Sequence, residues 1–293
     1  MTSLEKSVGS LLGRMQRRPL IGLLAFAVAF LGQWFRHTIF PLSEGLLGDL
    51  SYPFLIVMGT GGVVLIWRGL DEPEIPATWK GYLGGLLIWV GWFETSFHVF
   101  ADIFNIPPYQ ATPRLLSTPD LNLIQSSFAI FVPLFILYGL FNRETKCNLM
   151  RWMHRNLRMN PGMPTPNHKR NFARITALET IFVIWFCYAI WLLITYFGAS
   201  MTIIMGAYVL WAVWFVYIFL KLMKVTRIGH ALRYGIPVGI IGWVLVATPS
   251  HMRLFPAIWL KPFEYPLWSW LALFVFVAAI YVFTVPKTAS KVA

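Results

Sequence analysis

Charged residues are scarce in this sequence. Only 12% of its 293 residues are Asp, Glu, Lys or Arg, whereas 57% are hydrophobic; soluble proteins carry about twice that charged share. The hydrophobic residues form near-continuous blocks, and several blocks are long enough to cross a hydrocarbon layer of about 30 Å. The composition therefore predicts an all-α, polytopic membrane protein whose helices contact the lipid bilayer.

Cysteine is almost absent, with Cys147 in a basic loop and Cys187 in an apolar block. Two such residues provide neither a disulfide framework nor a CxxC motif. The sequence also lacks a Walker A loop, a GxSxG elbow, an HExxH motif, the histidine boxes of di-iron enzymes and a pair of in-span histidines for haem. ATP hydrolysis, zinc proteolysis and haem electron transfer are therefore disfavoured.

Acidic residues are also few, which leaves a net charge of +12. Nucleic-acid binding would need basic residues interleaved with aromatic ones on one exposed face. Here the cations lie between the apolar blocks, so we expect no nucleic-acid partner. Membrane topology explains them better.

The apolar blocks predict eight membrane spans. Their bounds follow from hydrophobic runs, flanking charges and prolines, and we expect them near 19–40, 51–67, 81–104, 120–141, 173–197, 201–221, 235–249 and 265–285. The seventh, ended by Thr248 and Pro249, is the weakest and is a candidate for a re-entrant or interfacial segment. The first has basic residues before it and no small-residue cleavage site after it, so we expect it to stay as an anchor.

The distribution of cations predicts the orientation of the spans. With both ends of the chain in the cytoplasm, 20 of the 24 Lys and Arg residues fall on the cytoplasmic side. The four exceptions are Arg36, Arg114, Arg253 and Lys261. This asymmetry follows the positive-inside rule, so we expect an N-in/C-in protein of the bacterial inner membrane.

A basic segment divides the chain into two four-span halves. We expect a cytoplasmic N-terminal segment (1–18), a first half (19–141), a basic cytoplasmic loop (142–172), a second half (173–285) and a cytoplasmic tail (286–293). Within the loop, Leu149, Trp152, Met153 and Leu157 recur at helical spacing among cations. This pattern favours a short helix on an anionic membrane surface. The alternative is a loop that docks other membrane subunits.

The third span carries the strongest candidate for a functional site. Glu94, His98 and Asp102 are spaced four residues apart, which places them on one face of a helix. Ionisable groups are costly in hydrocarbon, so this face should meet the protein interior or a water-filled cavity. We expect Glu94 to have a partner, with Arg36 and His37 as candidates.

The chemistry of this face stays open at the level of sequence. A carboxylate, an imidazole and a carboxylate form a mixed ligand set that a divalent metal such as copper, iron or zinc accepts, and the same groups could transfer a proton. Gln125, a buried polar residue of the fourth span, could face Glu94. Further outer-side groups that could complete a site are His37, Glu44, Asp49, Asp120, His251 and Glu264. Asp120 also follows a proline where a helix should begin, which is typical of a carboxylate in the first turn of a helix.

The region from 52 to 135 resembles the membrane-bound copper monooxygenase subunits that oxidise methane and ammonia. The resemblance rests on a span ending at 65–68, a proline-bearing loop at 76–79, a Gly-Gly-Leu-Leu opening at 84–87, Glu94 inside that span and Asp120 at the start of the next. It implies a helical membrane subunit with a copper centre and a small apolar substrate.

The sequence departs from the third-subunit copper motif of that family, in which Asp-x3-His is followed by a second His. Glu94 stands four residues before His98, and Ala111 stands thirteen residues after it. Copper ligation by this chain would need Glu94 in the place of the aspartate and a further ligand from elsewhere.

Three functional hypotheses follow. The first is a subunit of a metal-dependent oxidoreductase, in which Glu94, His98 and Asp102 bind the metal and a small apolar or lipid-soluble substrate enters from the bilayer. The second is a transporter or channel in which Glu94 exchanges a proton or a cation. The third is a non-catalytic accessory subunit that docks its partner through the 142–172 loop.

Overall fold

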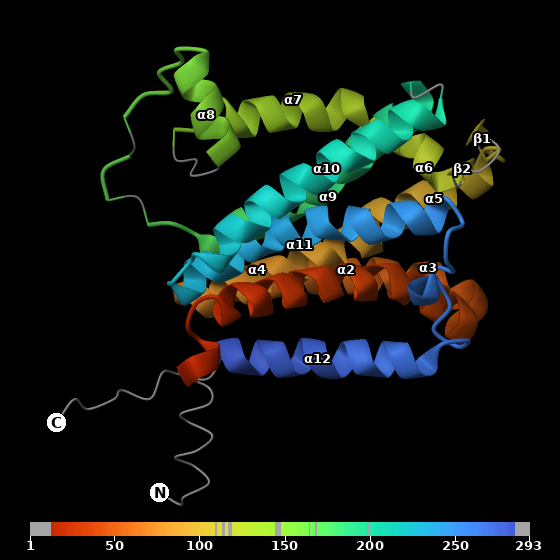
Figure 1. Ribbon diagram of the computed structural model, residues 1–293, viewed down its shortest axis with the longest axis horizontal. Coiled ribbons are helices and arrows are strands. Elements are labelled where there is room, and N and C mark those ends of the chain that lie inside the picture. The colour runs from red at the N-terminus through yellow and green to blue at the C-terminus, as the bar shows by residue number, and fades with distance from the viewer. Residues whose placement is uncertain are drawn as a thin grey trace, which may run out of the picture.

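Long helices make up most of the structure (Figure 1). The computed structural model describes residues 13–108, 110–112, 115–116, 119–143, 148–163, 165–167, 169–197 and 200–284. Cys147, Arg114, the tail 286–293 and the first twelve residues of the N-terminal segment lie outside this part of the chain. The α-helices are α2 (Leu20–Leu47), α3 (Ser51–Arg68), α4 (Glu74–Ile88), α5 (Thr95–Ile103), α6 (Pro119–Ile124), α7 (Phe128–Gly139), α8 (Asn148–Asn156), α9 (Phe172–Phe197), α10 (Met201–Met223), α11 (Ile228–His251) and α12 (Pro266–Thr284).

Single turns and one small hairpin join these helices. The 3-10 turns are η1 (Gly48–Leu50), η3 (Gln125–Ser127) and η4 (Ile258–Leu260), and the segment η2 (Trp89–Glu94) is a π-helix. Strands β1 (Gln110–Thr112) and β2 (Leu115–Leu116) pair antiparallel, with Gln110 opposite Leu116. The sequence did not predict this hairpin, which lies in the loop between the third and fourth predicted spans.

Six helical segments in the described part of the chain are long and apolar enough to cross a membrane, so the chain is an integral membrane protein. These segments are Leu20–Arg68, Asn122–Gly139, Phe172–Ile194, Met201–Met223, Ile228–His251 and Pro266–Thr284. The first, with 49 residues, contains both α2 and α3. The continuous helix of α4, η2 and α5 is not among the six. The count of eight spans and the N-in/C-in orientation therefore stay predictions.

Helices α2, α4, α9 and α11 run in the same direction. Tyr82 of α4 contacts Ala29 of α2, and Glu94 further along contacts Arg36 further along α2, so α2 and α4 are parallel. Along α4, Gly81 lies against Ala173 of α9 and Gly85 against Ala177, so both helices advance together. Along α11, Gly235 lies against Ala25 of α2, and Gly239 follows against Ala29 in the same order. These four helices correspond to the first, third, fifth and seventh predicted spans. Because successive spans cross a membrane in alternating directions, these four should be parallel.

Helices α10 and α12, which alternate with them, run the opposite way. The indole Nε1 of Trp211 in α10 donates to the carbonyl of Ile241 at 2.9 Å, and the hydroxyl of Tyr208 donates to that of Leu245 at 2.9 Å. The residue number falls along α10 as it rises along α11, so the two helices are antiparallel. Helix α12 is antiparallel to α2 in the same way. The Gln16 side chain, just before α2, donates to Val282 near the end of α12, whereas Phe35 further along α2 packs on the earlier Phe276.

Glycine allows α3 and α4 to approach closely. A Cβ atom on Gly62 would stand 2.7 Å from the carbonyl oxygen of Gly84, and a Cβ atom on Gly84 would stand 2.7 Å from the oxygen of Gly62. Small residues at helix interfaces permit such backbone contact, which replaces the hydrophobic driving force that lipid does not supply. The neighbouring Gly61 faces open space.

Helix α11 corrects the expectation for the seventh span. It does not end at Thr248 and Pro249 but continues to His251, with 24 residues. Pro249 has no N–H to donate to the carbonyl four residues earlier, which belongs to Leu245. The hydroxyl of Tyr208 donates to that carbonyl instead, at 2.9 Å, so the proline is accommodated inside the helix.

Helix α8 agrees with the short helix that the basic loop predicts. Met150 is buried and lies against Gly139 at the end of α7. The His154 ring bonds the Leu140 carbonyl at 2.7 Å, and Trp152 is exposed. These contacts dock α8 beside the end of α7.

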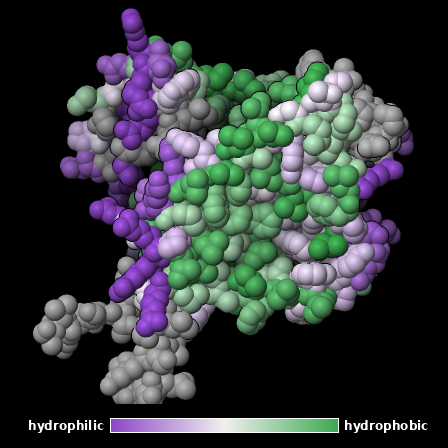
Figure 2. All heavy atoms as spheres, viewed as in Figure 1, coloured by the Kyte–Doolittle hydropathy of each residue, from purple (hydrophilic) through white to green (hydrophobic). Residues whose placement is uncertain are grey.

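The surface of the molecule has an apolar band with hydrophilic residues at its ends (Figure 2). Exposed residues of α3, α10 and α12, such as Val57, Leu210 and Phe274, contribute to the apolar surface, and each is more than two-thirds exposed. The hydrophilic residues at one end include the exposed Arg17 and Arg18, just before α2. Lipid tails would cover the band, and head groups would meet the ends.

Candidate functional site

The face of Glu94, His98 and Asp102 meets three different neighbours. Glu94 ends the π-helical segment η2, and the other two residues lie on α5. Glu94 and His98 are partly buried, as expected for ionisable groups in a span, whereas Asp102 is exposed. Each is engaged by a partner from another helix, so the three do not form a common centre.

Glu94 is paired with Arg36 of α2, one of its two predicted partners. A terminal nitrogen of Arg36 donates to a carboxylate oxygen of Glu94 at 2.6 Å. The Arg36 side chain is 2% exposed and that of Glu94 is 14% exposed. A π-turn is a frequent feature of functional sites, and here it ends at the residue that meets the buried cation.

Three more side chains hold the Arg36 guanidinium. Its Nε donates to the Gln33 side-chain oxygen at 3.0 Å, and a terminal nitrogen donates to the hydroxyl of Tyr188 in α9 at 2.8 Å. The same nitrogen donates to Nε2 of His37. Four donors of the guanidinium are thus satisfied, which fixes its position in the low dielectric between the helices.

His37 is neutral in this arrangement. A guanidinium has no acceptor, so the Nε2 atom that meets Arg36 carries no proton. The single proton of the ring is therefore on Nδ1. The ring stacks on Trp243 of α11, with centroids 5.4 Å apart.

Asp120, at the start of α6, is the predicted outer-side partner of the face. It lies in the first turn of that helix, as its position after a proline predicted, and a carboxylate oxygen stands 3.6 Å from Nε2 of His98. The His98 ring also stacks on Phe40 of α2, with centroids 4.0 Å apart. Asp102 accepts a hydrogen bond of 2.8 Å from the Tyr52 hydroxyl of α3. Gln125 lies in η3, and the hydrogen bonds found in the described ranges do not join it to Glu94.

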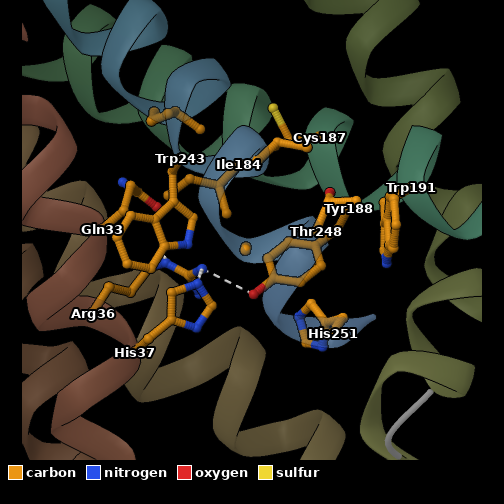
Figure 3. Close-up of a pocket in the computed structure, with 13 residues that line it drawn as sticks. Gln33, Arg36, His37, Ile184, Cys187, Tyr188, Trp191, Trp243, Thr248 and His251 are labelled. Atoms are coloured by element: carbon orange, nitrogen blue, oxygen red, sulfur yellow. Dashed lines mark hydrogen bonds between the residues drawn. The ribbon is translucent and has the colours of Figure 1, made fainter. Parts of the chain in front are cut away.

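A cavity opens beside the Arg36 network, between α2, α9 and α11 (Figure 3). Its volume is about 50 Å³, room for a few water molecules or for the edge of a ring inserted from its open side. Apolar and aromatic side chains form most of its wall. The lining residues are Gln33, Arg36, His37, Ile184, Cys187, Tyr188, Trp191, Ile240, Trp243, Val244, Ala247, Thr248 and His251.

The cavity lies in the half of α2 that is nearer its C-terminal end. Arg36 is 16 residues from the start of α2 and 11 from its end. At about 1.5 Å per residue these intervals correspond to about 24 Å and about 16 Å. The site is therefore nearer the C-terminal end of α2, which is the outer end in the predicted N-in/C-in orientation.

Sequence reasoning found part of this site. It identified Glu94, its partner Arg36 and the outer-side groups His37 and Asp120. It missed Gln33, Tyr188 and Trp243, because an amide and aromatic rings in a span resemble ordinary packing residues. The available signal was an arginine inside an apolar block, because a buried guanidinium needs several hydrogen-bond acceptors around it.

The metal prediction finds no support in the described ranges. In them no three or more His, Cys, Asp or Glu side chains are grouped so that they could hold a metal ion. Metal binding by Glu94, His98 and Asp102 stays a prediction.

No model of a known protein family matches the chain, and no curated protein or solved structure is significantly similar to it. The resemblance to copper monooxygenase subunits is therefore untested. The fold and the site define an integral membrane protein with a buried charge pair beside an intramembrane cavity.

Proposed function

We propose that this protein is an eight-pass, N-in/C-in membrane protein that binds a small lipid-soluble substrate in the cavity beside Arg36. The observation that carries the proposal is the fixed Arg36 network on the wall of an otherwise aromatic cavity. A concave, mostly apolar site with a few convergent polar groups is the usual form of a small-molecule site. The alternating helix directions support eight passes.

A purely structural role for Arg36 is the competing interpretation. Replacing a buried ion pair by apolar residues of similar volume often leaves stability unchanged or raises it, so stability alone does not explain why a span keeps such a pair. Intramembrane ionisable groups more often mark a substrate or ion pathway. The cavity beside the pair favours the substrate.

Proton transport through Glu94 is less well supported. The buried Arg36 guanidinium holds the Glu94 carboxylate at 2.6 Å, so we assign Glu94 the role of counterion to Arg36. Substrate binding is a step that the oxidoreductase and the transporter hypotheses share. The sequence resemblance to copper monooxygenases would make the substrate one that is oxidised, and that assignment rests on the resemblance alone.

A three-probe panel tests the proposal. The probes share a ten-carbon tail: a trimethyl-decyl-1,4-benzoquinone, the corresponding trimethyl-decylbenzene without the carbonyls, and 4-decylbenzoate. We expect at least one to bind the detergent-purified protein saturably, measured by calorimetry and by thermal stabilisation. Ala247→Phe, which fills the cavity, should abolish this binding.

Val213→Phe is the matched control, because Val213 lies on the exposed face of α10, outside the cavity. It should leave binding unchanged. Binding of no probe, or equal binding to the Ala247→Phe variant and the wild type, contradicts the proposed function.

A further inference from the structure

We infer that the ligand of the cavity is a neutral, planar molecule that accepts hydrogen bonds through carbonyl oxygens. This inference rests on the proposed function and specifies its substrate class. It follows from three features of the cavity: its charge, its hydrogen-bond donors and the arrangement of its rings.

The charge of the cavity favours a neutral ligand. The positive charge of Arg36 is already matched by Glu94 at 2.6 Å. A further anion would leave an unmatched negative charge in a medium of low dielectric, which is costly. A cation would meet no carboxylate, because none of the lining residues is Asp or Glu.

The donors of the cavity favour an acceptor on the ligand. Tyr188 uses its oxygen to accept from Arg36, so its hydroxyl proton is available to donate. The neutral His37 carries its proton on Nδ1, away from the Arg36 contact. Trp243 is 4% exposed, and its Nε1–H has no hydrogen-bond partner in the part of the chain that the structure describes.

A buried donor without a partner costs about 1–3 kcal/mol. In Figure 3 the Trp243 Nε1 atom lies on the side of the indole that faces Arg36 and Tyr188. A carbonyl oxygen in the cavity would supply the missing acceptor. An apolar ligand would leave the donor unpaired.

The rings of the cavity favour a flat ligand. Trp243 stacks with His37 on one side, with an angle of 20° between the ring planes. Trp191 stacks with His251 on the other side, with an angle of 30°. The Tyr188 ring lies between the two pairs in Figure 3. Aromatic walls bind a planar conjugated ring through offset or edge contacts.

The same panel tests the inference. All ring positions of the quinone probe carry a substituent or an oxygen, which hinders addition of the Cys187 thiol that also lines the cavity. We expect the quinone to bind the wild type at least tenfold more tightly than the trimethyl-decylbenzene and the 4-decylbenzoate. This comparison needs no variant, so it does not depend on the folding of one.

Trp243→Phe adds a second measurement. It removes the Nε1–H donor and should weaken quinone binding about three- to tenfold, as expected for one neutral hydrogen bond, while leaving the binding of the carbonyl-free probe nearly unchanged. Trp268→Phe, at an exposed position of α12, is the matched control and should affect neither probe.

The outcomes separate the inference from the proposed function. Binding of the decylbenzene or the benzoate as tightly as the quinone overturns the inference and leaves the proposed function intact. Equal effects of Trp243→Phe on all bound probes also overturn it, because the indole N–H would then not recognise an acceptor. Failure of all three probes overturns both, and the cavity is then a water-filled space.

Discussion

The Arg36 and Glu94 pair should make a large contribution to the free energy of unfolding when one partner alone is removed. Arg36→Met leaves the charge of Glu94 buried without a counterion and takes away the hydrogen bonds to Gln33 and Tyr188. Truncating one member of a buried pair typically costs about 3–5 kcal/mol. Glu94→Gln keeps an acceptor for the guanidinium but removes its counter-charge, so we expect a loss toward the lower end of that range.

The double variant Arg36→Met, Glu94→Gln carries no buried charge. It should therefore be less destabilised than the sum of the single variants, with a coupling energy of at least about 2 kcal/mol. The free energies of unfolding can be measured in mixed micelles by titration with a denaturing detergent. Comparing the wild type, the two single variants and the double variant separates the interaction energy of the pair from the packing that each substitution removes.

The exposed pair of Lys261 and Glu264 is the control for this cycle. Its nitrogen and oxygen stand 2.9 Å apart, but the side chains are 49% and 57% exposed. Solvent screens such pairs, so the coupling should be much smaller than that of the buried pair. A coupling for Arg36 and Glu94 as small as that of the exposed pair would show that Arg36 is solvated, and would refute the role assigned to it here.

Three further predictions concern other parts of the chain. Gly62→Leu should destabilise the protein strongly, because a Cβ atom there meets the backbone of α4, whereas Gly61→Leu, which faces open space, should be nearly neutral; melting temperatures of the two variants compare them directly. The His98 ring stacks on Phe40 and faces the Asp120 carboxylate, so we expect His98→Ala and the wild type to contain the same amount of metal by elemental analysis. Loss of a stoichiometric metal from the variant would instead support the metal site. Glu264 raises the pKa of Lys261 through its hydrogen bonds, so Glu264→Gln should lower that pKa in an NMR titration; the small stabilisation from the pair should be present below the usual lysine pKa and disappear as the pH rises through the raised value.

Several features of the fold were predictable because they depend on local composition. The long apolar blocks correspond to helices α2, α3, α9, α10 and α12 in position, and the amphipathic pattern after Cys147 corresponds to α8. The end of α11 was not predictable. Pro249 normally stops a helix, and only the Tyr208 hydroxyl of a neighbouring helix satisfies the carbonyl that this proline leaves free.

The candidate site was predictable only in outline. The spacing of Glu94 and His98 placed both on a buried face, and the cost of a charge in hydrocarbon required a partner such as Arg36. The spacing did not separate a shared centre from three separate contacts. The neighbouring helices decide between these arrangements. Asp102, about two turns beyond Glu94 along the helix, meets Tyr52 of α3 and not the Arg36 network.

By itself, the sequence determined that this protein belongs in a membrane and which residues carry charge inside it, because transfer energies depend on residue type and on the length of apolar runs. Only the tertiary structure decided what surrounds those charges. The cavity is made by side chains from α2, α9 and α11, and its most informative atom, the unpaired Nε1 of Trp243, is defined by the absence of an acceptor among described residues distant in sequence. Hydrogen-bond satisfaction is a property of three-dimensional neighbours, so no local pattern encodes it.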